Sequence, residues 1–321
     1  MEVVFLGTPP FAVPSLAGVA GSEKHRILAV VTQPDRPRGR GLQVSSSPVK
    51  AVAEGLGLAV WQPERLDDSW VERILATRAE AGVVVAFGQK IPAELLHGFE
   101  HGCINVHPSL LPRYRGAAPI QRAIMDGCAV TGVSTMYLDE GWDSGDLIFR
   151  KEVPITGEDT GQTLHDRLAE VGADLLCRTL DAAASGTAPR VPQDESLATY
   201  AERITAETAQ IDWTRPALAV FNQVRALYPQ PGAWTTLNGA LVKILASRIG
   251  DPQGRLVGSG SGPGVGSPCG AVLAAGEDVI LVQAGEGTTL AIETIQPAGK
   301  KPMSVDAFLR GHRLRQGEVF R

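Results

Sequence analysis

The chain has 321 residues, enough for about two domains and a sizeable core. Hydrophobic residues make up 44% and charged residues 20%, which excludes wholesale disorder, and no apolar run approaches the ~20 residues of a membrane-spanning helix. The 4 cysteines lie far apart without a CxxC pair, and the amino-terminal segment does not resemble a signal peptide. We therefore expect a cytoplasmic protein with no disulfide framework, no metal site and no membrane association.

The formal net charge of −5 argues against a nucleic acid as partner of the chain as a whole. The two parts of the chain differ, however. From Thr208 onward, 3 Lys and 8 Arg stand against 8 acidic residues, a net +3. The part before it holds 19 basic and 27 acidic residues, a net −8. This asymmetry indicates either a division of labour between two domains or an ordinary solvated surface.

The first 155 residues alternate between short β-branched runs and helix-like stretches. The predicted strands are residues 3–6, 27–32, 83–87, 104–107, 133–138 and 147–153. The predicted helices are residues 12–20, 49–54, 69–78 and 119–125. This pattern predicts an α/β fold with a Rossmann-like, mostly parallel sheet and helices on both faces, which binds ligands at the carboxyl ends of its strands. Neither GxGxxG nor GxxxxGK[ST] is present, so a nicotinamide or ATP site is not supported.

The rest of the chain predicts a second, smaller domain. A long amphipathic helix is expected over 159–184, followed by a polar, proline-containing linker over 187–205. Five short alternating strands come next and predict a small β-barrel of the OB type, with the glycine-rich residues 258–266 as a flexible loop. These strands are residues 233–237, 241–249, 271–275, 279–282 and 288–295. The expected domains are thus residues 1–186 and 206–321.

Candidate functional residues first occur in the predicted strand 104–107. Side chains alternate along a strand, so Asn105 and His107 share one face, and Pro108 ends the strand. An amide and an imidazole can both donate hydrogen bonds to an oxygen that gains negative charge as a carbonyl becomes tetrahedral. The other interpretation is a purely structural polar pair at the end of a strand.

A second candidate is the glycine-containing loop at 139–146. Its three aspartates, Asp139, Asp143 and Asp146, are either turn caps or functional carboxylates. The D-x-D-x-D-G spacing of a calcium loop is absent. A carboxylate beside His107 would stabilise the protonated imidazole and could relay protons.

Together these stretches resemble the signature of formyltransferases that use 10-formyltetrahydrofolate as co-substrate. The matching residues are Asn105-x-His107-Pro-Ser109-Leu-Leu-Pro112, Arg115-Gly116 and Asp139-x-Gly141-x-Asp143-x-Gly145-Asp146. The resemblance implies that Asn105 and protonated His107 stabilise the oxyanion, while Asp143 holds His107 charged and carries the proton of the attacking amine. It also implies folate contacts from the loop after the strand, for which anchoring in the core is the alternative. The loop residues are Ser109, Leu110, Leu111 and Pro112.

Further segments are similar to the branch of this family that formylates the α-amino group of methionine on initiator methionyl-tRNA. They are residues 33–41, 47–50, 116–121, 193–196, 199–204, 211–213, 296–303 and 306–311. The resemblance implies a tRNA-binding carboxyl-terminal domain and tRNA contacts from two basic segments, for which a solvated surface is the alternative. The contact residues are Arg36, Arg38, Arg40, Lys300 and Lys301, with Arg310, Arg313 and Arg315 as an extension. We expect the enzyme to be a monomer.

Four other functions compete with this interpretation. Glycinamide ribonucleotide formyltransferase shares the Asn-His-Asp trio but lacks a second domain, whose expected length disfavours it here. A sugar-nucleotide formyltransferase would not require the arginine-rich loop after residue 35. A formyltetrahydrofolate hydrolase would use water in place of the amine. A nucleic-acid-binding module with a degenerate enzyme domain would not need the intact trio.

Overall fold

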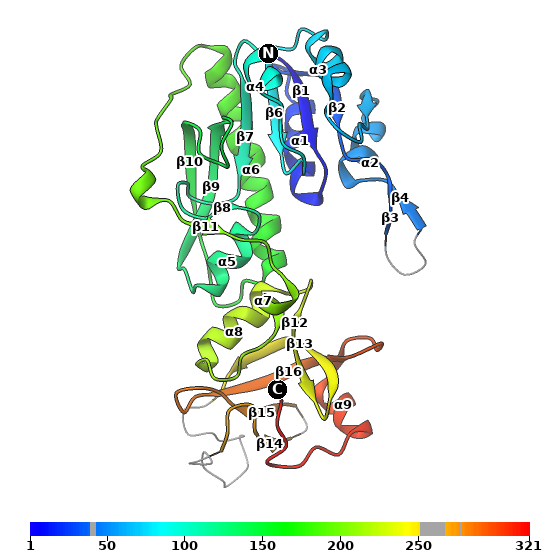
Figure 1. Cartoon of the computed structure of the whole chain (residues 1–321), viewed down its shortest axis with the longest axis vertical. Helices are drawn as coiled ribbons and strands as arrows, with labels where there is room; N and C mark the ends of the chain where they lie inside the picture. The colour runs from blue at the N-terminus through cyan, green and yellow to red at the C-terminus, as the bar shows by residue number, and fades with distance from the viewer. Residues whose placement is uncertain (39–42, 251–266, 277) are drawn as a thin grey trace. The chain divides into compact units, whose positions relative to one another are not determined.

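The computed structural model describes residues 1–38, 43–250, 267–276 and 278–321, and the chain divides into two compact units (Figure 1). Unit 1 consists of Met1–Pro119, Val130–Pro154 and His165–Glu202. Unit 2 consists of Ile120–Ala129, Ile155–Leu164 and Arg203–Arg321. Two short segments that precede residue 165 therefore belong to unit 2.

Unit 1 is built around a 7-stranded sheet in the order β10-β9-β7-β6-β1-β2-β5. Five neighbouring strands of the sheet run parallel, namely β7, β6, β1, β2 and β5. β9 and β10 are antiparallel to their neighbours. All of β6, Ala-Gly-Val-Val-Val, is buried, as expected of a parallel strand covered on both faces. The predicted Rossmann-like sheet is confirmed, although the short β5 was not predicted. The strands are β1 (Glu2–Gly7), β2 (Arg26–Val31), β5 (Val60–Trp61), β6 (Ala81–Val85), β7 (Cys103–His107), β9 (Val130–Tyr137) and β10 (Leu147–Pro154).

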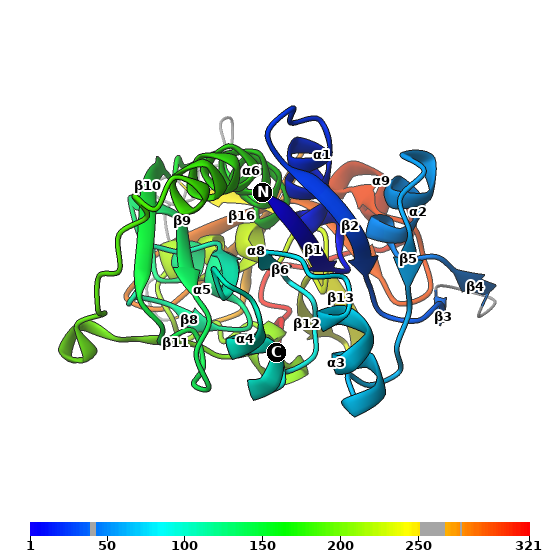
Figure 2. The same ribbon diagram turned by 90° about the horizontal axis from the view of Figure 1, so that it is seen from above.

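Helices cover both faces of this sheet, as predicted (Figure 2). α1 (Val13–Ala20) and α6 (Gly161–Ala184) lie on one face, and α3 (Asp68–Leu75) and α4 (Ala93–Gly98) lie on the other. Apolar side chains of α3 and α4 pack with the sheet in one buried cluster that includes Ile74, Leu95, Val4, Leu6 and Val84. The remaining helices of the first 130 residues are η1 (Pro10–Ala12), α2 (Pro48–Gly55) and α5 (Pro119–Met125).

Local hydrogen bonds define the ends of α6. The Thr160 hydroxyl accepts from the backbone N–H of Thr163 at 3.1 Å, and the Thr163 hydroxyl accepts from that of Thr160 at 2.9 Å. Such a reciprocal pair satisfies amide groups that an isolated helix would leave unpaired. Beyond the helix, Gly186 has φ +70°, which glycine adopts without steric cost. The helix predicted over 159–184 is therefore confirmed with a start two residues later.

Unit 2 contains an antiparallel sheet in the order β12-β13-β16-β15-β14, with β17 paired to β16. Residues at the end of the chain join both edges of this sheet, because Phe320 bridges Leu237 and Val319 bridges Ala271. The sheet thereby closes on itself, in agreement with the predicted barrel. The strands are β12 (Ala233–Leu237), β13 (Ala240–Ile249), β14 (Val272–Ala275), β15 (Ile280–Gln283), β16 (Thr289–Pro297) and β17 (Met303–Ser304). The helices are α7 (Ala206–Ala209), α8 (Ala217–Ala226) and α9 (Val305–Gly311). The glycine-rich residues 258–266 lie outside the described residues.

Four very short strands and one turn of helix complete unit 1. β3 (Arg36–Arg38) and β4 (Gln43–Ser45) form a hairpin, and β8 (Arg115–Gly116) pairs in parallel with β11 (Tyr200–Ala201). η2 (Glu195–Leu197) and β11 both come from the segment 187–205. Within the described parts of the chain, no helix has the length and apolarity that crossing a membrane requires.

Candidate active site

Strand β7 presents Asn105 and His107 on the same face. Ile104 and Val106 point the other way and are 0% and 2% exposed, so they fix the register of the strand in the core. Asn105 and His107 are themselves only 8% and 5% exposed. The Asn105 amide forms no hydrogen bond with any residue that the structure describes. A buried amide without a protein partner is suited to bind a polar atom of a ligand.

Both ring nitrogens of His107 face oxygen atoms. Nε2 lies 2.9 Å from the backbone carbonyl oxygen of Tyr114, which can only accept, so we assign a proton to Nε2. Nδ1 lies 3.6 Å from Oδ2 of Asp143. A neutral ring with its proton on Nε2 would turn the Nδ1 lone pair toward this carboxylate, whereas a protonated ring turns an N–H toward it. The Asp143 carboxylate is therefore the acceptor that faces the second ring nitrogen of His107.

Asp143 lies on the loop between β9 and β10 with its backbone at φ +51°, a region that residues other than glycine seldom adopt. Its Oδ2 accepts a hydrogen bond of 2.8 Å from the backbone N–H of Gly116. Its Oδ1 has no partner among the described residues. The carboxylate therefore has one oxygen fixed beside His107 and one oxygen available to a ligand.

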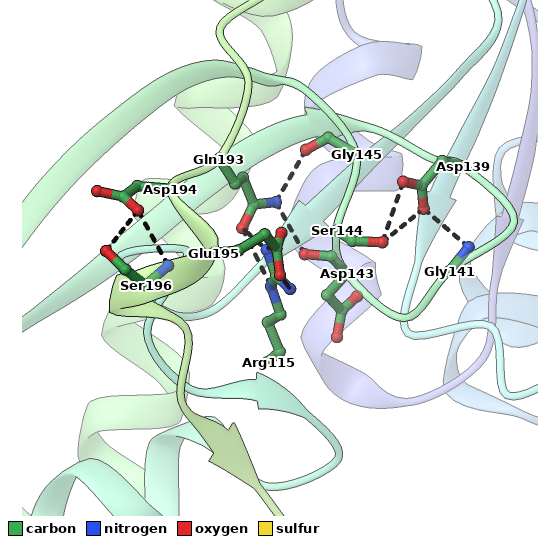
Figure 3. A network of polar contacts seen from close by, with 10 residues as sticks. All are labelled: Arg115, Asp139, Gly141, Asp143, Ser144, Gly145, Gln193, Asp194, Glu195 and Ser196. Atoms are coloured by element: carbon green, nitrogen blue, oxygen red, sulfur yellow. Dashed lines mark hydrogen bonds and ion pairs between the residues drawn. The ribbon is translucent and has the colours of Figure 1, made fainter.

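Residues far along the chain hold the loop of Asp143 in place (Figure 3). The Gln193 amide donates hydrogen bonds of 2.8 Å to the carbonyl oxygens of both Asp143 and Gly145. The Arg115 guanidinium donates to Oε1 of Gln193 at 2.9 and 3.2 Å and forms a bidentate pair with Glu195. The hydrogen-bonded Glu195 carboxylate raises the pKa of Arg115, whose side chain is buried. Arg115 and Gln193 both belong to the sequence motifs, but the motifs did not indicate the hydrogen bonds between their side chains.

Backbone and side-chain bonds also determine the loop 109–112. The Ser109 hydroxyl donates to the carbonyl oxygen of Arg113 at 2.6 Å, and Ser134 of β9 links the backbone of Ser109 to that of Leu111. Leu111 is fully buried in a cluster with Met136 and Leu147. Leu110, in contrast, is half-buried.

The basic residues proposed from the sequence lie on two separate segments. Arg36 is exposed at the start of β3, 3.9 Å from a carboxylate oxygen of Glu64, and Arg38 ends β3. Arg40 lies outside the described residues. Lys300 and Lys301 are exposed between β16 and β17.

The base of the β3–β4 hairpin is held by charges. Lys50 Nζ lies 2.5 Å from Oδ2 of Asp35, and the Gln62 amide donates to Oδ1 at 2.8 Å. The Lys50 ammonium and then the Gln62 amide lower the pKa of Asp35. The Asp35 carboxylate in turn raises the pKa of Lys50. Asp35, just before the hairpin, is thus bonded to Lys50 of α2 and to Gln62.

The structure provides no evidence of a thiol nucleophile or a metal centre in this region. Burial raises the pKa of the Cys103 thiol to about 12, which keeps it protonated and unreactive. Among the described residues, no group of three or more His, Cys, Asp or Glu side chains could hold a metal ion. The arrangement around His107 instead offers an amide donor, an imidazole and a carboxylate, which suit acyl transfer.

Comparisons with known proteins cover nearly the whole chain. Residues 1–180 match the formyl transferase family model, and residues 203–313 match that of the formyl transferase carboxyl-terminal domain. The chain is 45% identical to a methionyl-tRNA formyltransferase from Moorella thermoacetica, over 99% of both chains. It is 44% identical to one from Halothermothrix orenii, again over 99% of both.

Solved structures share the fold at lower identity. HypX from Aquifex aeolicus in complex with tetrahydrofolic acid matches with a TM-score of 0.65 and 17% identity, over 96% of this chain and 47% of that one. A methionyl-tRNA formyltransferase from Clostridium thermocellum matches with a TM-score of 0.55 and 15% identity, over 77% of this chain and 93% of that one. This chain belongs to the formyl transferase family.

Proposed function

We propose that the protein transfers a formyl group from 10-formyltetrahydrofolate to the α-amino group of methionine on initiator methionyl-tRNA. Relatives named for this activity are 44–45% identical and match both units over 99% of their length. The single observation that carries the chemistry is the buried Asn105 amide, which has no hydrogen-bond partner among the described residues and lies two residues before His107, the partner of Asp143. The folate would supply the formyl group and leave through its N10 nitrogen.

The Asn105 and His107 side chains would stabilise the formyl oxygen as negative charge develops on it. The Asn105 amide donates one hydrogen bond, and the protonated His107 ring supplies a positive charge and the Nδ1 proton. The separation of 3.6 Å between Nδ1 and Asp143 exceeds a normal hydrogen bond, so this proton can be shared with a substrate oxygen. Removal of one such donor typically lowers kcat by roughly 10²–10³.

Asp143 would serve as the proton carrier. Its Oδ2 stays beside His107 through the Gly116 N–H, while its Oδ1 is available to accept a proton from the attacking amine. The proton would then pass toward the leaving nitrogen, directly or through water. The half-buried Leu110 would contribute apolar contact to the folate beside this site. The rest of the loop, Ser109, Leu111 and Pro112, would hold Leu110 in place.

The tRNA would be bound by basic side chains. Arg36, Arg38 and Arg40 would contact phosphates near the acceptor end, and Lys300 and Lys301 would extend the contact on the carboxyl-terminal part. We take residues 1–186 as the catalytic domain, 187–205 as the linker and 206–321 as the tRNA-binding domain. The enzyme would work as a monomer in the cytoplasm.

The decisive experiment supplies purified protein with 10-formyltetrahydrofolate and either initiator or elongator methionyl-tRNA. We expect N-formylated methionyl-tRNA from the initiator form, and no product from a His107→Ala variant that binds tRNA normally. Formate release without tRNA would identify a hydrolase. Formylation of an amino-sugar nucleotide or of glycinamide ribonucleotide instead of tRNA would identify one of the other transferases. Binding of tRNA without any turnover would identify a nucleic-acid-binding module.

A further inference from the structure

A residue from a distant segment of the chain, Gln193, forms hydrogen bonds with the loop that carries Asp143. Gln193 is 50 residues away in sequence, yet its side-chain amide donates to the carbonyl oxygens of Asp143 and Gly145, each at 2.8 Å (Figure 3). One amide group thus brackets Ser144 and fixes the backbone on both sides of it. The Asp143 backbone needs such support, because φ +51° is an unfavourable conformation for a residue with a Cβ atom.

Arg115 fixes the orientation of this amide. Its Nε and one terminal nitrogen donate to Oε1 of Gln193, so the NH₂ group of Gln193 faces the loop. Arg115 is 1% exposed and is held by both carboxylate oxygens of Glu195 at 2.9 and 2.7 Å. The two side chains therefore form a fixed support rather than a mobile surface contact.

The residue next to Arg115 also contacts the carboxylate of Asp143. Gly116, the residue after Arg115, donates its backbone N–H to Oδ2, the oxygen that lies 3.6 Å from His107. β8, which contains Arg115 and Gly116, is paired in register with β11. Backbone and carboxylate of Asp143 are thus held from one rigid group of residues.

We propose that Gln193, oriented by Arg115, is a positioning residue that sets the Asp143 carboxylate against His107 for formyl transfer. This inference rests on the proposed function, since it needs the catalytic role of Asp143. A displacement of about 1 Å in a catalytic group commonly lowers the rate by about 10²-fold. Loss of the Gln193 donors therefore affects kcat, while substrate binding is retained.

The test is a double-mutant cycle with Gln193→Glu and Asp143→Asn. Glutamate has nearly the same shape and keeps the oxygen that Arg115 binds, but it turns an oxygen instead of an NH₂ group toward the two carbonyls. We expect Gln193→Glu to lower kcat by about 30- to 100-fold, with the KM values for folate and tRNA changed by less than about threefold. In the Asp143→Asn background the same change should cost less than about threefold, because the group that it positions is already lost.

Two further variants provide controls. Ser196→Ala removes an exposed hydroxyl bonded to Asp194 on the same segment and should leave kcat unchanged. Arg115→Lys keeps the positive charge but loses the two N–H donors that orient Gln193. It should also lower kcat while the KM values for folate and tRNA change little. The proposal is overturned by a wild-type kcat in Gln193→Glu, by a loss confined to KM, or by equal losses in both backgrounds of the cycle. A wild-type protein that formylates no tRNA would instead refute the proposed function.

Discussion

The loop that carries Asp143 and the hairpin that carries Arg36 belong to the same unit, and they are held in opposite ways. The loop is bonded along its length, from Gly116 to the carboxylate, from Gln193 to two carbonyls and from Ser144 to Asp139. The hairpin is tied at its base, by Lys50 and Gln62 to Asp35, and Arg36 is exposed.

The difference in how the loop and the hairpin are held fits the two functions proposed for them, proton transfer and phosphate binding. A carboxylate that handles a proton must stay close to its partners, and hydrogen bonds hold the carboxylate of Asp143 and two backbone carbonyls of its loop. Cations that meet the phosphates of a large polyanion gain from reach and exposure, and they tolerate imprecise placement. Substitutions in the two regions should therefore affect different kinetic constants.

The largest effect is expected from the catalytic side chains themselves. Asn105→Ala and Asp143→Asn should each lower kcat by about 10²–10³, because each removes a group that acts on the reacting atoms. The Kd for tRNA, measured by filter binding, should change by less than about twofold, since neither residue belongs to the basic segments. Near-normal turnover in either purified variant would remove that residue from the site.

A smaller effect should follow when the loop is displaced without loss of any functional group. A Cβ atom on Gly145 would lie 2.0 Å from the carbonyl oxygen of Tyr137, so Gly145→Ala must shift the loop. We expect kcat to fall by about 10- to 100-fold with the Asp143 carboxylate still present. Gly157→Ala is the matched control, because a Cβ there meets nothing within 4 Å. Equal kcat values for the two variants would show that the loop is not held rigidly.

On the hairpin, the comparison predicts an effect on tRNA binding and its salt dependence. Arg36→Leu and Arg40→Leu should each raise the Kd for tRNA several-fold and lower the slope of log Kd against log salt by about 0.7–0.9, the contribution of one phosphate contact. Turnover at saturating tRNA should be unchanged. An unaltered salt slope would contradict the assigned phosphate contacts.

Sequence patterns predicted well what periodicity encodes. The alternation along β7 placed Asn105 and His107 on one face, and the β-branched runs gave most of the parallel sheet. β5 was missed because two residues are too few to form a pattern. The resemblance to the formyltransferase signature singled out Asp143 among the three aspartates of its loop, although only the structure shows its distance to His107 and its backbone conformation.

The support behind Asp143 could not be predicted in this way. Gln193 and Arg115 are separated by 78 residues, and a hydrogen bond between such residues leaves no periodic trace in the sequence. The polar composition of 187–205 favoured a linker, and nothing in it indicated that Gln193 bonds to the catalytic loop. Likewise, burial of Leu111 beneath its own loop depends on packing with Met136 and Leu147 rather than on local sequence.

The smallest effect is expected at the base of the hairpin, where Lys50→Met removes the partner of Asp35. The KM for tRNA should rise about two- to fivefold with kcat unchanged, because an ion pair near the surface contributes modestly to holding the segment. The depressed pKa of Asp35 means that its contribution to stability is present above the ordinary value of 3.8 and is lost as the pH falls through the lowered one. The raised pKa of Lys50 means that its contribution is present below 10.5 and is lost as the pH rises through the higher one.

The lowered pKa of Asp35 and the raised pKa of Lys50 together predict how the stability of the hairpin base depends on pH. The difference in Tm between the wild type and Lys50→Met should stay constant between about pH 6 and 8 and shrink as the pH falls below 3.8, the ordinary pKa of Asp35, toward its lowered pKa in the folded protein. Asp35→Asn should give the same KM shift, and in its background the effect of Lys50→Met on Tm should not change at low pH. A Tm difference that varied within the neutral range would mean that another titrating group ties the ends of the segment, and the contrast with the rigidly bonded Asp143 loop would then have to be redrawn.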